Sequence, residues 1–279
     1  MAEPRPAVAL PPKAVLNAPV VKRVRYRKNF IKTAVCELRF PTLLELESRP
    51  PIQFQRKIRK HYPFYEPQTV ELMAGDETSR EHRYLFRSKD QHWTVSVKSF
   101  ALGIETSKYV DFEDFFGRFK EIFAGAKSMI DADFFTRIGL RYINTIPLQD
   151  GVVEGWVRAE LVAPLTTGVL GEATRFASII QGEMEDGHFS LRHGMKDETQ
   201  RALRDDDITR HEADAAKKAA ATIQPVTRSY QLDFDYYSEN VELGAVESCI
   251  KRFNETNFAL FSWCLGEKAK QLLGEGKPK

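Results

Sequence analysis

Apolar and polar residues alternate along several short segments of this chain. Between residues 68 and 107, four such segments follow one another at a spacing of roughly ten residues, with turn sequences such as GDETS and SKDQ between them. Alternation with a period of two places successive side chains on opposite faces of a strand, so the region predicts an antiparallel meander with one buried face. AVCELRF (34–40) and FFTRIGLRYINTIPL (134–148) predict two further strands.

The apolar period changes to three and four in two longer segments. A phenylalanine stripe predicts a helix over residues 111 to about 129, and acidic residues in its first turn suit a helix N-terminus. A second helix is predicted from about 241 to 273. Shorter helices are expected at 52–60, after a Pro-Pro pair, and within 150–165, where Pro164 would end the helix.

The order of strands followed by a long helix occurs twice along the chain. ATRFASIIQGE (173–183), HFSLRHGM (188–195) and SYQLDFDYY (229–237) predict the later strands, and the second long helix follows them. The pattern predicts an α+β fold of two tandem halves, each mainly antiparallel sheet packed against a long amphipathic helix, and it indicates internal duplication.

The predicted boundaries follow from composition. The proline-rich residues 1–21 are predicted to form a disordered or extended arm. Residues 22–150 are assigned to the N-terminal half and residues 151–279 to the C-terminal half. A highly charged insertion at 196–222 lacks aromatic residues, proline and glycine. It reads as either an exposed helical excursion or a mobile loop.

Composition favours a globular protein and gives no strong overall charge. The chain has 42% hydrophobic and 29% charged residues, and its formal net charge is only +2. Neither nucleic acid nor a membrane would therefore be attracted by the charge of the whole chain. No long uncharged apolar stretch is present, and the three cysteines have no CxxC spacing, so we expect a cytoplasmic protein in a reducing compartment.

Charged pairs on three predicted strands form the candidate ligand-binding site. The common nucleotide, metalloprotease and hydrolase motifs are absent from the sequence, so catalytic residues stay unknown and neither a metal site nor a cofactor is expected. Arg137 and Arg141 share one face of their strand, Asp233 and Asp235 share one face of another, and Arg39 lies with Glu37 on a third. If these strands adjoin, the side chains form a polar layer that recognises an anion or performs acid–base chemistry. The alternative is a set of ordinary ion pairs on a solvated sheet face.

A basic stretch before the first strand is the candidate nucleic-acid interface. Aromatic residues interrupt its charges, and such a pattern can neutralise phosphates and stack bases. A solvated edge explains the same pattern. The basic residues concerned are Lys22, Arg23, Arg25, Arg27 and Lys28.

The segments VCELRF, RIGLRYIN and YQLDFDYY resemble those of a sporadically distributed, uncharacterised bacterial protein family of about 250 residues. The resemblance covers most of the chain from about Tyr26 to Leu265 and leaves the charged insertion outside. It implies a bacterial cytoplasmic protein and, by analogy with other patchily distributed families, a defence-related or mobile gene neighbourhood.

Three functional hypotheses follow, in this order. The first is a non-enzymatic binding or regulatory module that recognises a protein segment or an anionic small molecule. The second is a metal-dependent enzyme acting on a phosphorylated or nucleotide substrate, with the two aspartates as metal ligands or acid–base groups. The third is nucleic-acid binding through the basic stretch. No membrane partner is expected, and the sequence leaves open whether the chain forms a homo-oligomer.

Overall fold

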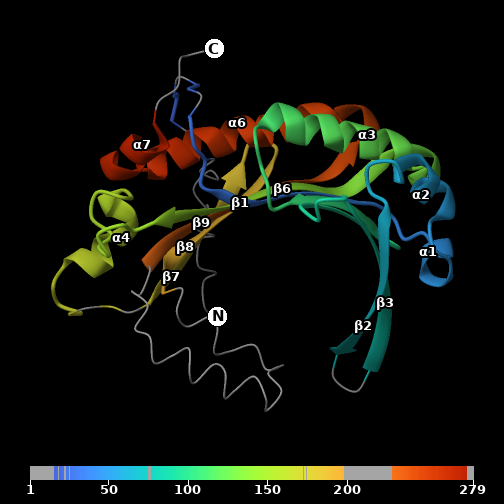
Figure 1. The fold of residues 1–279 in the computed structure, drawn as a ribbon, viewed down its shortest axis with the longest axis horizontal. Coiled ribbons are helices and arrows are strands. Elements are labelled where there is room, and N and C mark those ends of the chain that lie inside the picture. The colour runs from blue at the N-terminus through green and yellow to red at the C-terminus, as the bar shows by residue number, and fades with distance from the viewer. Residues whose placement is uncertain are drawn as a thin grey trace, which may run out of the picture.

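Nine strands form one antiparallel sheet that bends away from a layer of helices (Figure 1). The computed structural model describes residues 16–274 except 18, 22, 25, 75–76, 172, 174 and 198–227. Across the sheet the strands follow the order β2-β3-β4-β5-β1-β6-β9-β8-β7. The strands are β1 (Ile31–Arg39), β2 (Phe64–Ala74), β3 (Glu77–Arg87), β4 (Trp93–Lys98), β5 (Ala101–Thr106), β6 (Phe134–Pro147), β7 (Phe176–Met184), β8 (Gly187–Asp197) and β9 (Arg228–Glu242).

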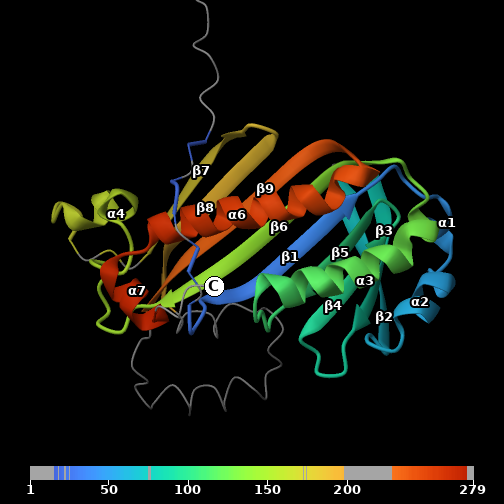
Figure 2. The ribbon, with the colours of Figure 1, turned by 90° about the horizontal axis from the view of Figure 1, so that it is seen from above.

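The helices lie beside or on one face of this sheet. Two 19-residue helices, α3 and α6, run across the same face, which we call the helix-covered face, and α6 contacts β6 and β9 (Figure 2). The opposite, concave face carries none of the described helices, and we call it the helix-free face (Figure 1). The helices are α1 (Glu45–Ser48), α2 (Ile52–Ile58), α3 (Phe112–Ile130), α4 (Ala159–Thr166), the 3-10 turn η2 (Leu243–Ala245), α6 (Val246–Cys264) and α7 (Glu267–Leu273).

The core lies between the helices and the sheet because the strands alternate as the sequence pattern predicts. On β1, Cys36 and Leu38 are buried while Glu37 between them faces the other way. Cys36 is paired in register with Leu140 of β6, which is fully buried on the same face. One face of each central strand is therefore apolar and the other is polar.

Helix α3 begins and packs as its sequence predicts. The side chain of Asp111 caps the first turn by accepting a hydrogen bond from the backbone N–H of Asp114, at 2.9 Å. Phe112, Phe116 and the next two phenylalanines of the stripe stack in sequence, with ring centroids 5.2 to 6.1 Å apart. The stripe packs into the core, and the predictions of an α+β fold, of mainly antiparallel strands and of a helix from 111 to about 129 are confirmed.

The prediction of one continuous helix over 241–273 is wrong. Strand β9 continues to Glu242, and the helical region that follows is broken at Leu265 and Gly266 into α6 and α7. The reason is tertiary contact with residues 155–158. A Cβ on Gly266 would lie 2.2 Å from the carbonyl oxygen of Gly155, so only glycine fits there, and its N–H donates to the Trp156 carbonyl at 2.9 Å.

Three other predictions of local structure have different outcomes. Pro164 lies inside α4 instead of ending it, and since only two helical residues follow, the cost of its missing N–H is confined to the last turn. In the predicted arm, Leu16 donates a backbone hydrogen bond to Glu183 on the edge strand β7. The predicted insertion lies outside the described residues, apart from its first two, which belong to β8.

None of the helices that the structure describes is both long enough and apolar enough to cross a membrane.

Candidate functional site

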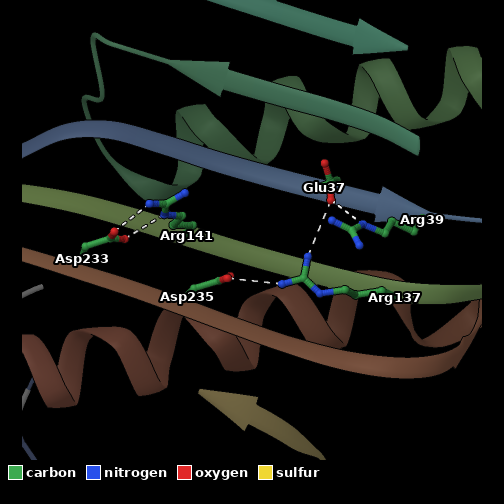
Figure 3. A network of polar contacts seen from close by, with 6 residues as sticks. All are labelled: Glu37, Arg39, Arg137, Arg141, Asp233 and Asp235. Carbon is green, nitrogen blue, oxygen red and sulfur yellow. Dashed lines mark hydrogen bonds and ion pairs between the residues drawn. The ribbon is translucent and has the colours of Figure 1, made fainter. Parts of the chain in front are cut away.

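The five predicted ligand-binding residues lie together on the helix-free face of three adjacent strands (Figure 3). Strand β6 is central, with β1 on one side and β9 on the other. The register places Arg39 opposite Arg137 and Arg141 opposite Asp235. With Glu37 added, we call this set the charged cluster; its members are Glu37, Arg39, Arg137, Arg141, Asp233 and Asp235.

Arg141 and Asp233 form the closest ion pair of the charged cluster. The Nε and Nη2 atoms of Arg141 donate to the two carboxylate oxygens of Asp233 at 2.8 and 2.7 Å, which is a bidentate geometry. Asp233 lies two residues from the position directly opposite Arg141, so the guanidinium reaches diagonally across the strands. The side chain of Asp233 is only 4% exposed although no described helix covers this face.

Arg137 lies along its own strand and joins the other members of the cluster. Its Nη2 is 3.3 Å from Asp235 and its Nη1 is 3.6 Å from Glu37. A Cβ on Gly139 would lie 3.4 Å from the guanidinium, so the glycine leaves the side chain room to run flat over the sheet. The guanidinium also lies over the ring of Tyr237, 4.3 Å from its centroid. Together, Glu37, Gly139, Asp235 and Tyr237 therefore hold this arginine in one orientation.

Arg39 completes the cluster on β1 and is its most exposed arginine. Its Nε donates to Glu37 at 2.7 Å, and 45% of its side chain is exposed. Glu37 therefore bridges Arg39 and Arg137. Arginine offers five N–H donors, so Arg39 and the partly exposed Arg141 keep donors for a ligand.

Two members of the cluster, Asp235 and Arg141, have pKa values shifted by their surroundings. Burial raises the pKa of Asp235 above its ordinary value, and the nearby Arg137 and Arg141 only partly oppose this effect. The bidentate hydrogen bond to Asp233 raises the pKa of Arg141. Perturbed pKa values cluster at functional sites, and this makes the charged cluster a candidate ligand site.

A row of polar contacts continues from the cluster to the sheet edge. Tyr237 stacks on His188 of β8 at a centroid distance of 4.9 Å, and the His188 ring nitrogen lies 3.0 Å from Glu183 of β7. These three residues were not predicted because the contacts depend on the register between β9, β8 and β7. The alternation of side chains along β8 predicts His188 and His193 on opposite faces of the sheet. His193 is buried against Tyr230, so His188 lies on the other face.

The basic stretch lies away from the charged cluster, against the C-terminal helices. Arg23 lies over the ring of Phe258 in α6, at 5.9 Å, and the backbone N–H groups of Arg27 and Lys28 donate to the carbonyls of Gly274 and Leu273. The side chains of Arg23, Arg27 and Lys28 are exposed. The other two predicted members, Lys22 and Arg25, lie outside the described residues.

The charged cluster does not carry a ready-made metal-ligand set. Within the described ranges, no group of three or more His, Cys, Asp or Glu side chains is placed to hold a metal ion. Asp233 and Asp235 each face an arginine, and no further ligand joins them in the network drawn in Figure 3. The arrangement is chemically suited to exchanging its internal ion pairs for ion pairs with a partner.

No protein-family model, curated protein or solved structure matches the chain. The resemblance to an uncharacterised bacterial family therefore stays a prediction.

Proposed function

We propose that the chain is a non-enzymatic binding module that receives a segment of a partner protein on the helix-free face, at the charged cluster. The observation that carries this proposal is the convergence of six charged side chains on three adjacent strands, with Asp233 almost fully removed from water. A polar network of this kind is preorganised, because each guanidinium is held by carboxylates and by the sheet beneath it.

The balance of charge in the cluster favours a protein segment as ligand. Three arginines face three carboxylates, and each arginine already has an acidic partner. A small anion could reach the remaining donors of Arg39 and Arg141, but it would add negative charge to a cluster in which three carboxylates already balance the three arginines. A peptide that carries both acidic and basic side chains can form new ion pairs with the arginines and with the carboxylates of the cluster. No charged group of either sign is then left without a partner.

Site-specific crosslinking in cells of the source organism tests the proposal. A photo-crosslinking amino acid is placed at Arg192, which is exposed on the helix-free face opposite Asp233, or at Glu247, which is exposed on α6. We expect a protein crosslink from position 192 and none of the same mass from position 247. The crosslinked segment, made as a peptide, should bind the purified chain with an affinity that falls as salt rises.

The double variant Arg137→Ala/Arg141→Ala supplies the control. Its circular dichroism should match that of the native chain, while crosslinking at position 192 and peptide binding are lost. Unchanged crosslinking in a folded double variant would contradict the proposal. Binding of inorganic phosphate with no protein crosslink would instead assign the cluster to an anionic ligand.

We also infer that the chain arose by duplication of one α+β unit with a long amphipathic helix. The element orders β1-α1-α2-β2-β3-β4-β5-α3 and β6-α4-β7-β8-β9-η2-α6 correspond, since each begins with a central strand and ends with a 19-residue helix. In the sheet, β5 flanks β1 as β9 flanks β6. This correspondence supports a boundary between α3 and β6, before the one expected at residue 150. Related sequences aligned half against half should match β1 to β6 and α3 to α6; a better match in any other register would contradict the duplication.

A further inference from the structure

The two edges of the sheet, β7 and β2, differ in how they are protected against pairing with another chain. β7 ends one side of the nine-stranded sheet and β2 ends the other (Figure 1). An edge strand presents unpaired backbone N–H and C=O groups, and proteins ordinarily block such edges with charges or proline. β7 lies outside the charged cluster, so the proposed function does not depend on what this strand pairs with.

β2 carries the ordinary protection and β7 does not. Pro67 in β2 has no backbone N–H, and the exposed Glu66 and Glu71 lie on the same strand. β7 has the sequence FASIIQGEM, which contains no proline and no basic residue. Its single charged residue, Glu183, lies one position from the end. Of these two edges, β7 is therefore the open one.

The middle of β7 points its free backbone groups away from the sheet. The carbonyl of Glu183 faces outward, since it accepts a hydrogen bond from the backbone N–H of Leu16 at 2.9 Å. In an antiparallel ladder the groups of alternate residues point to opposite sides, so residues 177, 179 and 181 also face outward. Among the described residues, none gives these three positions a backbone partner on the outer side. The contact with Leu16 covers the hairpin end and leaves the middle of the edge free.

Two isoleucines expose apolar surface on both faces of this free part. Ile179 is 63% exposed and Ile180 is 43% exposed, and successive strand residues point to opposite faces. Burial of apolar surface contributes about 25 cal/mol per Å². A strand laid along β7 would cover both side chains and would also satisfy the outward backbone groups.

The charges at the two ends of β7 favour a second copy of the chain in antiparallel orientation. The exposed Arg175 precedes the strand, whereas Glu183 and the exposed Glu185 lie at the hairpin end. Antiparallel pairing brings the basic end of one copy beside the acidic end of the other, twice in each pair. Parallel pairing would place like charges together. Since β7 is already extended, a second copy also pairs without the entropy cost of ordering a flexible segment.

We propose that two copies of the chain associate through antiparallel pairing of their β7 strands, about a two-fold axis at Ile179. In this register Ile179 lies opposite Ile179 of the second copy, and Ala177 lies opposite Gln181 of the second copy. The two sheets become one, with both charged clusters on the same side of it. Because the edge at β2 is protected, the association stops at two copies.

The mass of the full chain at rising concentration tests the association. Sedimentation equilibrium should detect a dimer of twice the 31.9 kDa of one chain by about 1 mM. Ile179→Lys places a charge in the middle of the pair, so it should raise the dissociation constant of the dimer by about tenfold or more. Its circular dichroism should match that of the native chain, because the replaced side chain is exposed. Phe64→Lys, at an exposed apolar site on β2, is the matched control and should associate as the native chain does.

Cysteine crosslinking tests the register. Residue 177 and residue 181 of the second copy have Cα atoms about 5.5 Å apart in such a pair. The two copies of residue 181 lie about 14 Å apart, because each residue advances the strand by about 3.4 Å. A mixture of Ala177→Cys and Gln181→Cys chains should therefore be joined by a short bifunctional reagent faster than Gln181→Cys chains alone. The native cysteines are buried and do not compete for the reagent.

Three results would overturn the assignment. The first is a native chain that stays monomeric over the whole concentration range. The second is an Ile179→Lys variant that dimerises as the native chain does, or a Phe64→Lys variant that loses the dimer as well. The third is a mixture of the two cysteine variants that is crosslinked no faster than Gln181→Cys chains alone.

Discussion

The two faces of β6 show two different ways of burying polar groups. On the helix-covered face, Tyr142 is fully buried among apolar side chains and donates a hydrogen bond to the buried amide of Asn254. On the helix-free face, Arg141 and Arg137 are held by carboxylates from the strands on either side. The first arrangement depends on apolar packing, and the second on the pairing of charges.

This difference indicates which face of the sheet can change its side chains with little loss of stability. Apolar burial dominates folding energetics, whereas partly exposed ion pairs contribute little net stability. The helix-covered face therefore sets the fold, and the helix-free face can vary its charges at small cost. The exception on the helix-free face is the buried carboxylate of Asp233, which belongs to the site for which we propose a partner segment.

Removal of a core ring should have the largest effect. Phe119→Ala in α3 should lower the free energy of unfolding by about 3–5 kcal/mol, because it removes a ring that is 2% exposed and leaves a cavity. Urea unfolding measures the change. Phe64→Ala, at a site that is 49% exposed on the edge strand β2, should cost much less. Equal losses in the two variants would contradict the division between the faces.

Loss of one partner of the buried ion pair should have an intermediate effect. Arg141→Ala leaves Asp233 buried without its bidentate donor, so we expect a loss of about 1–3 kcal/mol in the same assay. The exposed control Arg39→Ala should cost less than about 1 kcal/mol.

The double variant Arg141→Leu/Asp233→Leu sharpens this test. Replacement of both partners removes the unpaired charge, so a large part of the stability lost in Arg141→Ala should return. A double variant that is less stable than Arg141→Ala would show that the pair stabilises the fold beyond satisfying its own charges.

The smallest expected effect is a pH dependence at Asp235. Because burial raises the pKa of this carboxyl in the folded chain, the folded state holds its proton more tightly than the unfolded state does. Its contribution to stability is complete below the unfolded pKa of about 3.9 and falls as pH rises through the raised folded pKa. The difference in unfolding free energy between the native chain and Asp235→Asn should therefore decrease with pH across that window. A difference that increases with pH would contradict the direction of the shift.

Sequence periodicity predicted most of the fold because the central strands obey a period of two and α3 a period close to 3.6. It also placed the arginines and aspartates on single strand faces. It could not choose between Asp233 and Asp235 as the partner of Arg141, because that depends on register and on a diagonal reach across the strands.

A long-range contact explains why the prediction of one continuous helix over 241–273 is wrong. The apolar period continues through Leu265 and Gly266, yet the helix is broken there by the close approach of Gly155. Local helix propensity carries no information about a contact with a residue that lies about a hundred positions away in the chain.

The position of β1 in the sheet has a consequence for synthesis of the chain. β1 leaves the ribosome before the other described strands but lies in the interior of the sheet, where Ala34 pairs with Thr106 on one side and with Tyr142 on the other. Until those partners are made, both of its hydrogen-bonding edges are open to other chains. Charges within an apolar strand discourage such pairing, so we expect Glu37 and Arg39 to protect the nascent chain against aggregation before they take their places in the charged cluster.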